Sequence, residues 1–389
     1  MSRNTIRMPH LLSMAAAAAT LPTALAATLD LPIHFFNTYA NVEVEIGTPA
    51  QSYMLHFDTG SSTTWVNDKN CGDACSNTSG RERAYYDVSA SSTGHSRGAR
   101  ASMDYFGGVT AGPTYDDKFV VPDGDFEWTQ SFLSADQSSW NNLGSDGFMG
   151  LAFNSISDGN TTTVVETLMQ QGNLDESRFG IYYGKEFNTT GSNPDGVLTI
   201  GGSREEKYVD GEITYVPLRY EPPYQVWRTV LSSITGTTEK GGKKQSASNS
   251  LGTYGNAVFD TGAGSISVPN SIVDEIYASI GWDYEAILHG KHMPLCSEFN
   301  SSWSFTFNFG EGALDPNLTM TGDQFARPGF AYRDDACYPP FEGSDNEGMA
   351  LIGTPLMQQF YTIFDFGGDH ADDFHPRIGF GQLKEGVKP

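Results

Sequence analysis

The chain has 389 residues, of which 38% are hydrophobic and 43 are glycine, and this length predicts more than one hydrophobic core. Its 47 Asp and Glu outnumber 23 Lys and Arg, which gives a net charge of −24. Because such a surface repels polyanions, we expect neither nucleic acid nor an anionic membrane as a partner.

Residues 1–26 have the features of a secretory signal peptide. Arg3 and Arg7 precede an apolar run at 11–19, and Ala24-Leu25-Ala26 offers a small-residue cleavage site before Ala27. No later stretch of the sequence is long and apolar enough to span a bilayer. The sequence therefore predicts a secreted, extracellular protein.

The first half is rich in strand patterns. Residues 41–47 alternate apolar and polar side chains, and the apolar run 53–57 ends at the turn signal Asp58-Thr59-Gly60. The other expected elements are a strand at 63–66, a hairpin with paired glycines at 101–112, a buried strand at 145–153, a helix at 163–169 and a strand at 197–202.

The second half repeats this organisation after a boundary expected at 207–216. The polar, Gly/Ser-rich segment 239–251 indicates an exposed loop, and the strand at 257–259 leads into Asp260-Thr261-Gly262. An amphipathic helix is expected at 271–280, and strands at 361–366 and 377–381 close the chain.

Two acidic turns form an internal repeat. Asp58 and Asp260 lie 202 residues apart, and each is followed by an apolar-apolar-Gly element whose glycine, Gly150 or Gly353, comes 92 or 93 residues later. A single Asp-Thr-Gly is an ordinary turn, but two copies with matched surroundings indicate duplicated halves. Each half then presents one carboxylate at the tip of a turn.

Two such carboxylates define a specific chemistry. Like charges a few ångströms apart do not both ionise, so the pair shares a proton. One carboxylate acts as a base on water while the protonated partner polarises a carbonyl. This reaction requires no metal ion and no cofactor, and we expect none.

These motifs, together with Ile46-Gly47-Thr48-Pro49-Ala50-Gln51, resemble the pepsin-like aspartic proteases over residues 35–383. The shared-proton pair is established for pepsin. The resemblance implies an all-β, bilobal fold with a few short helices and an active cleft between lobes 27–210 and 211–389. It also implies a monomer that hydrolyses internal bonds of protein or peptide substrates at acidic pH, with a preference for large apolar residues.

The resemblance also assigns roles to individual residues. Asp58 and Asp260 are the expected catalytic pair, and the hairpin at 101–112 is the expected flap that closes over bound peptide. The expected supporting and substrate-binding residues are Thr59, Gly60, Ser61, Trp65, Tyr105, Gly108, Thr261 and Gly262. Ser61 can donate to Asp58, and Trp65 supports the flap residue Tyr105, although a plain core role for Trp65 stays open.

Four cysteines and five sequons agree with export. Cys71 and Cys75 close a short loop, and the family pattern pairs Cys296 with Cys337. A Cys-x3-Cys spacing can also begin a metal site, but no histidine cluster completes one. The expected glycosylation sites are Asn77, Asn160, Asn188, Asn300 and Asn317.

The sequence departs from the family pattern in several places. There is no room for a pro-segment after residue 26, so we expect no inhibited zymogen. Gly107 stands where some fungal relatives carry an acidic side chain, which predicts poor cleavage after lysine. In the second acidic turn, Ala263 stands where most family members have Ser or Thr. Thr354 stands where the family usually has an Asp, directly after the second apolar-apolar-Gly element. His56 is either a modifier of the pH profile or a hydrogen-bonded core histidine.

Two other functions remain as alternatives. A non-catalytic relative with the same fold would bind a glycan, an inhibitor or a protein partner. A glycosidase would also use two carboxylates. Because both aspartates are retained within paired Asp-Thr-Gly turns, peptide hydrolysis is the favoured interpretation.

Overall fold

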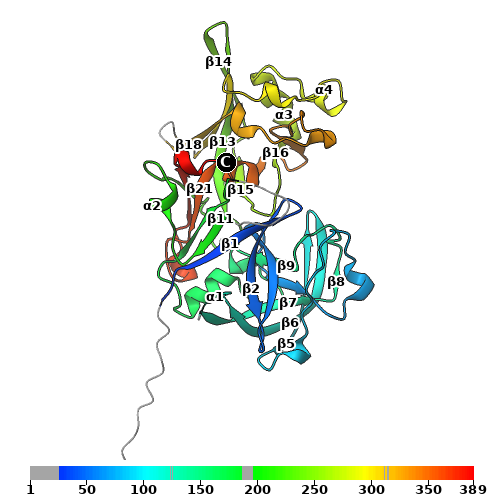
Figure 1. Ribbon diagram of the computed structural model, residues 1–389. Coiled ribbons are helices and arrows are strands. Elements are labelled where there is room, and N and C mark those ends of the chain that lie inside the picture. Colours follow the sequence, from blue (N-terminus) through cyan, green and yellow to red (C-terminus); the bar gives the residue numbers. More distant parts are fainter. Residues whose placement is uncertain (1–25, 123, 125, 186–195, 311, 313–314) are drawn as a thin grey trace, which may run out of the picture.

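The computed structural model describes residues 26–122, 124, 126–185, 196–310, 312 and 315–389. The expected signal peptide, apart from residue 26, and the sequon at Asn188 lie outside this part of the chain. Strands dominate the described residues and gather into two sheets, which confirms the expected all-β class with a few short helices (Figure 1).

The larger sheet has 14 strands in the order β12-β22-β21-β10-β11-β1-β2-β3-β9-β4-β7-β6-β5, with β8 paired to β6. Its strands are β1 Leu29–Phe36, β2 Tyr39–Ile46, β3 Gln51–Asp58, β4 Trp65–Asn67, β5 His95–Tyr105, β6 Gly108–Val120, β7 Glu127–Ala135, β8 Gln137–Ser138, β9 Gly147–Gly150, β10 Arg178–Tyr182, β11 Gly196–Ile200, β12 Thr214–Pro217, β21 Phe360–Asp365 and β22 Arg377–Gln382.

The smaller sheet has eight strands in the order β18-β17-β13-β15-β20-β16-β19, with β14 paired to β13. Its strands are β13 Arg228–Lys240, β14 Lys243–Ser250, β15 Asn256–Phe259, β16 Ile266–Pro269, β17 Trp303–Phe309, β18 Asn317–Thr321, β19 Glu342–Ser344 and β20 Met349–Ile352. The described α-helices are α1 Val164–Gln170, α2 Glu205–Tyr208, α3 Asn270–Ser279, α4 Tyr284–Leu288 and α5 Thr354–Met357.

Most elements expected from hydrophobic patterning are present. The helices expected at 163–169 and 271–280 are α1 and α3, and the closing strands are β21 and β22. The side chain of Thr163 caps α1 by accepting from the Glu166 N–H, and α3 buries Val273, Ile276 and Tyr277 on one face. These segments are confirmed because each carries its own periodicity and end signals.

The expectation of an irregular loop at 239–251 is wrong. Strand β13 continues to Lys240 and β14 returns from Lys243, and the two pair as a long antiparallel hairpin that projects from the molecule (Figure 1). The two glycines at its tip, Gly241 and Gly242, both have positive φ, as a tight hairpin turn requires. The segment is exposed on both faces, so it lacks the hydrophobic alternation by which a strand is recognised.

The internal repeat has a structural counterpart in each sheet. Strand β3 runs parallel to β9, with Asp58 opposite Gly150, and β15 runs parallel to β20, with Phe259 opposite Ile352. The apolar-apolar-Gly elements therefore lie beside the strands that carry the two acidic turns. This pairing explains why the same intervals recur in both halves of the sequence.

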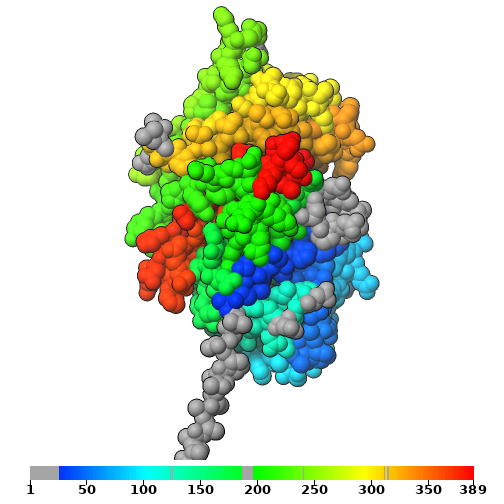
Figure 2. Space-filling model, turned by 60° about the vertical axis from the view of Figure 1, so that its left-hand side comes forward, coloured from blue at the N-terminus to red at the C-terminus, as the bar shows by residue number. Residues whose placement is uncertain are grey.

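Strands from both ends of the chain meet in the larger sheet. β21 pairs with β10, and β22 pairs with β12, so segments on either side of residue 210 share one sheet. The C-terminal residues, red in Figure 2, lie against the segment coloured green, where the Tyr182 hydroxyl donates to the Val387 carbonyl at 2.9 Å. Within the described part of the chain, no helix combines the length and apolarity needed to cross a membrane.

Candidate active site

Each acidic turn is held by backbone contacts to its apolar-Gly element. The Leu151 N–H donates to the Asp58 carbonyl at 2.8 Å, and the Asp260 N–H donates to the Ile352 carbonyl at 3.0 Å. A Cβ added at Gly150 would lie 2.3 Å from backbone atoms of Ser62, so this position requires glycine. Each turn is therefore held by contacts within its own half, in addition to its contacts with the other turn.

The two turns are joined by reciprocal hydrogen bonds of their threonines. Thr59 Oγ1 donates to the Phe259 carbonyl at 2.8 Å and accepts from the Thr261 N–H at 3.0 Å. Thr261 Oγ1 donates to the Phe57 carbonyl at 2.9 Å and accepts from the Thr59 N–H at 3.0 Å. Both threonines are buried, so these bonds are shielded from water and fix the turns in a symmetric arrangement.

The two carboxylates converge on the glycines of the turns. Gly60 N–H donates to Asp58 Oδ1 and Gly262 N–H donates to Asp260 Oδ1, both at 2.8 Å. A Cβ added at Gly60 would lie 2.7 Å from Asp260 carboxyl atoms, and one at Gly262 would lie 2.8 Å from Asp58 Oδ1. Each glycine therefore lets the opposite carboxylate approach its backbone, and the structure brings Asp58 and Asp260 together.

The side chain that follows the glycine differs between the two acidic turns. Ser61 Oγ donates to Asp58 Oδ2 at 2.5 Å, whereas the matching position in the second turn is Ala263, which has no hydroxyl. Burial, the charge of Asp58 and hydrogen bonding with it raise the pKa of Asp260 well above its usual value, and backbone donors only partly offset this. Burial and the neighbouring Asp58 carboxylate therefore favour the protonated form of Asp260.

His56 lies in the core beneath the first turn. Its side chain is 2% exposed, its Nδ1 contacts the Ala40 carbonyl at 2.7 Å, and its ring packs edge-on against Tyr39 and Phe148. Burial lowers the pKa of His56, although the charge of Asp58 opposes this effect. Of the two roles left open by the sequence, these contacts match the hydrogen-bonded core histidine.

The hairpin expected to be the flap is formed by β5 and β6, and Tyr105 and Gly108 pair at its tip. Burial and the charge of Asp58 raise the pKa of the Tyr105 hydroxyl. Its oxygen lies near the Ser61 and Trp65 side chains but has no hydrogen-bond partner among the described residues. Trp65 is fully buried and stacks on Phe148 at a centroid distance of 5.1 Å. Tyr105 and Trp65 therefore lie on the Asp58 side of the site.

Sequence reasoning missed the aromatic side chains beside Tyr105. The Tyr105 ring lies 5.6 Å from Trp140 and 5.3 Å from Phe148, and those two rings lie 5.0 Å apart. Phe148 was recognised only as part of the apolar-Gly element. Trp140 lies in an irregular Ser- and Asn-rich segment with no periodicity, so its only signal was a large aromatic residue among small polar ones.

The cysteines and sequons lie away from the two carboxylates in the sequence. The structure joins Cys71 to Cys75 and Cys296 to Cys337. The four sequons that the structure describes are all exposed, at Asn77, Asn160, Asn300 and Asn317. Every expected site residue except Asn188 therefore has a described position.

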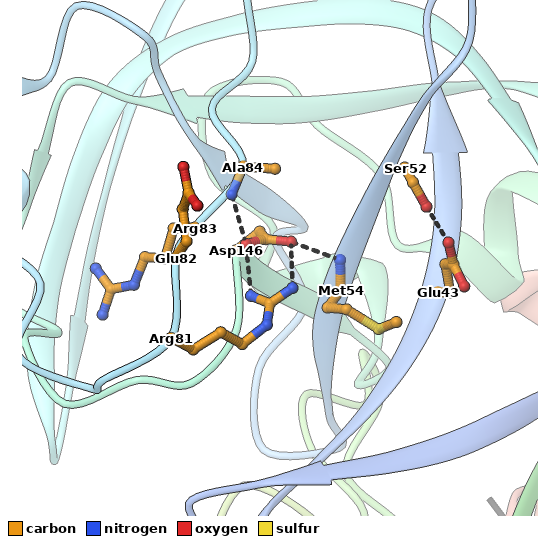
Figure 3. A pocket seen from close by; sticks show the side chains of 8 residues that line it. All are labelled: Glu43, Ser52, Met54, Arg81, Glu82, Arg83, Ala84 and Asp146. Atoms are coloured by element: carbon orange, nitrogen blue, oxygen red, sulfur yellow. Dashed lines mark hydrogen bonds and ion pairs between the residues drawn. The ribbon is translucent and has the colours of Figure 1, made fainter. Parts of the chain in front are cut away.

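An open pocket of about 460 Å³ lies at the far end of β3 from Asp58 (Figure 3). Arg81 donates to the buried Asp146 carboxylate at 2.8 Å, and that carboxylate also accepts from the backbone N–H groups of Met54 and Ala84. The Asp146 carboxylate therefore has its hydrogen-bond partners within the protein, and these bonds connect β3 to the segment that precedes β9. The pocket is therefore lined by a structural ion pair between Arg81 and Asp146, and it is separate from the Asp58 and Asp260 carboxylates.

Comparison with known proteins gives one consistent family. The model of the family described as eukaryotic aspartyl protease matches residues 38–374. The chain is 27% identical to mouse (Mus musculus) gastricsin over 356 residues, covering 87% of this chain and 81% of gastricsin. It is 28% identical to pig (Sus scrofa) pepsin A over 355 residues, with coverages of 88% and 83%. It is also 28% identical to a probable vacuolar protease A of Trichophyton verrucosum over 353 residues, with coverages of 86% and 78%. The chain therefore belongs to the family of eukaryotic aspartyl proteases, which are aspartic-type endopeptidases.

Proposed function

We propose that this protein hydrolyses internal peptide bonds with a water molecule activated between Asp58 and Asp260. The observation that carries the proposal is the convergence of the two carboxylates on Gly60 and Gly262 from turns that are joined by reciprocal threonine bonds. Two acids held this close share a proton, which provides one base and one acid in a single site.

The two acids take different roles. Asp58, which accepts from Ser61 and Gly60, is the base that removes a proton from water. Asp260, whose pKa is raised, donates its proton to the carbonyl oxygen as the water oxygen bonds to the carbonyl carbon. The resulting tetrahedral diol then breaks its C–N bond as Asp58 gives the proton it took from water to the amide nitrogen and Asp260 takes a proton back from a diol hydroxyl, which restores both acids. Asp260 must be protonated when water attacks, so the proposal includes activity at acidic pH.

The preferred substrates in this proposal carry large apolar side chains beside the scissile bond. Tyr105, Trp140 and Phe148 form an aromatic wall next to Ser61 and Trp65, on the same side of the site as Asp58. Such a wall gains free energy by burying apolar surface and offers no carboxylate to a lysine. Because both carboxylates come from one chain, the active unit of the proposal is a monomer whose two lobes are residues 27–210 and 211–389.

The proposal also includes secretion after removal of residues 1–26. Two disulfides suit an oxidising compartment, and the exposed sequons suit glycosylation. Protein secreted from a eukaryotic host should begin at Ala27 and lose mass on treatment with an N-glycosidase. Cytoplasmic retention of the full chain would contradict this part of the proposal.

The catalytic assignment is tested by Asp58→Asn and Asp260→Asn, each of which removes one member of the acid–base pair. Each should lower kcat/KM for a peptide substrate by at least about 10³-fold while leaving a folded, secreted protein. Asp146→Asn is the control for loss of a carboxylate, because Asp146, like Asp58, is buried but lies outside the site. Hydrolysis by the parent should also be blocked by a pepstatin-type inhibitor. A loss smaller than about 10³-fold in either site variant would exclude the assignment, whereas a folded parent that hydrolyses no peptide would leave a non-catalytic binding role.

A further inference from the structure

The flap is hydrogen-bonded to a neighbouring segment, residues 137–143, which we call the platform. β8, which is part of the platform, pairs with β6 at Thr110 and Ala111. Closer to the flap tip, the Val109 N–H donates to Ser139 Oγ at 2.8 Å, and the Ser139 N–H donates to the Val109 carbonyl at 2.9 Å. The position of the flap therefore depends on the position of the platform.

Trp140 makes the contact between the platform and the flap tip. A Cβ added at Gly107 would lie 2.6 Å from Trp140 Cη2, and one at Gly108 would lie 3.2 Å from its Cε2. The indole therefore packs directly against the side-chain-free faces of the two tip glycines. Because Tyr105 also packs on this ring, the Trp140 position determines how close the flap tyrosine comes to the Asp58 side of the site.

The backbone of the platform is held by the side chain of Arg83. Its Nη2 donates to the carbonyls of Trp140 at 2.6 Å, Asn141 at 3.2 Å and Leu143 at 2.8 Å. Nε donates to the same Leu143 carbonyl at 3.1 Å, and Nη1 donates to the Ser76 carbonyl at 3.4 Å. One guanidinium thus connects three carbonyls of the platform with the segment that follows the Cys71–Cys75 disulfide.

This use of arginine is unusual because Arg83 is buried and has no ion pair among the described residues. Its exposed fraction is 5%, and the nearby Asp146 carboxylate is taken by Arg81, while the Arg83 guanidinium turns away from it (Figure 3). Burial lowers the pKa of Arg83. The guanidinium of arginine nevertheless keeps its charge in proteins. A buried cation is costly unless hydrogen bonds satisfy it, so the carbonyls must keep their positions around the guanidinium.

We propose that Arg83 is a positioning residue for catalysis: by fixing the platform it places Trp140 under the flap, and so sets the closed position of Tyr105. Arg83 does not touch the carboxylates, and its effect passes through Trp140. The kinetic part of this inference rests on the proposed endopeptidase function. The structural part, that Arg83 controls the flap, does not.

The test compares Arg83→Met, which keeps the aliphatic stem, with Arg83→Lys and with the control Arg100→Met. Arg100 lies on the flap strand β5 but pairs with Asp136 at the surface, so the control loses a cation without changing the platform carbonyls. Amide hydrogen exchange at Val109 reports the flap–platform bond directly. Steady-state kinetics give KM and kcat for peptide substrates, and titration with a pepstatin-type inhibitor gives the concentration of active sites needed to calculate kcat.

In Arg83→Met, Val109 exchange should rise at least tenfold while exchange in β3 and β9 stays within twofold of the parent. KM for peptides with a large apolar residue before the scissile bond should rise about tenfold, with kcat changed less than threefold. Arg83→Lys should fall between Arg83→Met and the parent, because an ammonium cannot reach all the carbonyls. Trp140→Ala should reproduce the KM change, and adding Arg83→Met to it should change KM no further. Arg100→Met should match the parent.

Unchanged Val109 exchange in a folded Arg83→Met protein would overturn the inference, as would a rise that β3 and β9 share equally. If Arg83→Met is not secreted in folded form, the inference is tested with Arg83→Lys instead. Val109 exchange in Arg83→Lys within twofold of the parent would then overturn the inference. A parent that hydrolyses no peptide would refute the proposed function, yet the exchange result would still test whether Arg83 holds the flap.

Discussion

At the scale of single residues, the difference between Ser61 and Ala263 is the main asymmetry of the site. The backbone of the two turns is nearly symmetric, since Gly60 and Gly262 make equivalent 2.8 Å bonds to their own aspartates. Only the first turn adds a hydroxyl donor, from Ser61 to Asp58. Within the two turns, the Ser61 hydroxyl is therefore the side-chain donor that distinguishes Asp58 from Asp260.

This asymmetry predicts the pH dependence of the enzyme. In Ala263→Ser, a new hydroxyl donates to the ionised form of Asp260, which favours that form and lowers its raised pKa. Asp260 then loses its proton at lower pH. The bell-shaped profile of kcat/KM against pH should therefore move to lower pH by about one unit. The shift belongs to the coupled pair and not to Asp260 alone.

Ser61→Ala serves as the reverse control for this prediction. It removes a donor from the ionised carboxylate pair, so its bell should move toward neutral pH. Profiles of kcat/KM for the parent and both variants check the two directions together. Identical profiles, or two shifts in the same direction, would refute the argument.

At the scale of elements, the site depends on hydrogen bonds that join the ends of strands from the two halves of the chain. The Thr59 and Thr261 hydroxyls pair with two backbone carbonyls and two backbone N–H groups of the opposite turns. The parallel pairs β3–β9 and β15–β20 deliver these turns to the same place. Rigid strands thereby position the carboxylates more accurately than long loops would.

Removing either threonine hydroxyl should therefore destabilise the protein and disturb catalysis. Thr59→Val and Thr261→Val each leave one carbonyl and one N–H unpaired, which should lower the free energy of unfolding by about 2–4 kcal/mol. Both should also lower kcat at least tenfold, because the carboxylates lose their fixed separation. Denaturant unfolding in the Asp260→Asn background, which prevents self-digestion, measures the stability.

Thr362→Val is the matched control for this experiment. Thr362 is fully buried in β21, and its hydroxyl has no hydrogen-bond partner among the described residues. The same substitution there should change the free energy of unfolding by less than about 1 kcal/mol, because no bond is lost. An equal cost at positions 59, 261 and 362 would show that the cost comes from burial of valine and not from the shared bonds.

At the scale of the whole molecule, two disulfides constrain very different lengths of chain. Cys71–Cys75 closes a separation of 4 residues, whereas Cys296–Cys337 closes a separation of 41. The loop of the second bridge includes β17, β18 and the partly buried Arg327, whose side chain donates to the Gly264 carbonyl beside the second acidic turn at 2.7 Å. This bridge therefore supports a large part of the second half.

Loss of the longer bridge should cost more stability. The chain-entropy model gives about 4 kcal/mol for replacing Cys296 and Cys337 by alanine, and about 2 kcal/mol for the Cys71 and Cys75 pair. Urea unfolding of the two double-alanine proteins in the Asp260→Asn background tests the order. A larger loss from the short bridge would instead show that the Cys71–Cys75 loop acts by supporting the platform through Ser76.

Much of the fold and site could be predicted from the sequence because the signals are local. Asp58-Thr59-Gly60 and Asp260-Thr261-Gly262 each lie within one contiguous strand and turn, and the matched Gly150 and Gly353 reveal the duplication. Helix α3 carries its own 3.6-residue periodicity. Local sequence signals therefore predicted the paired acidic turns, and the family resemblance that these turns carry predicted the class of fold.

Only the tertiary structure decided what depends on contacts between distant, irregular segments. The bonds from Arg83 to the Trp140 and Leu143 carbonyls join segments 57 and 60 residues apart, and neither segment has a periodic pattern. Strand β14 of the hairpin at 239–251 has no buried residue, so no hydrophobic alternation in the sequence indicates this strand. The raised pKa of Asp260 arises from burial and from Asp58, whose distance is fixed only when both halves fold together.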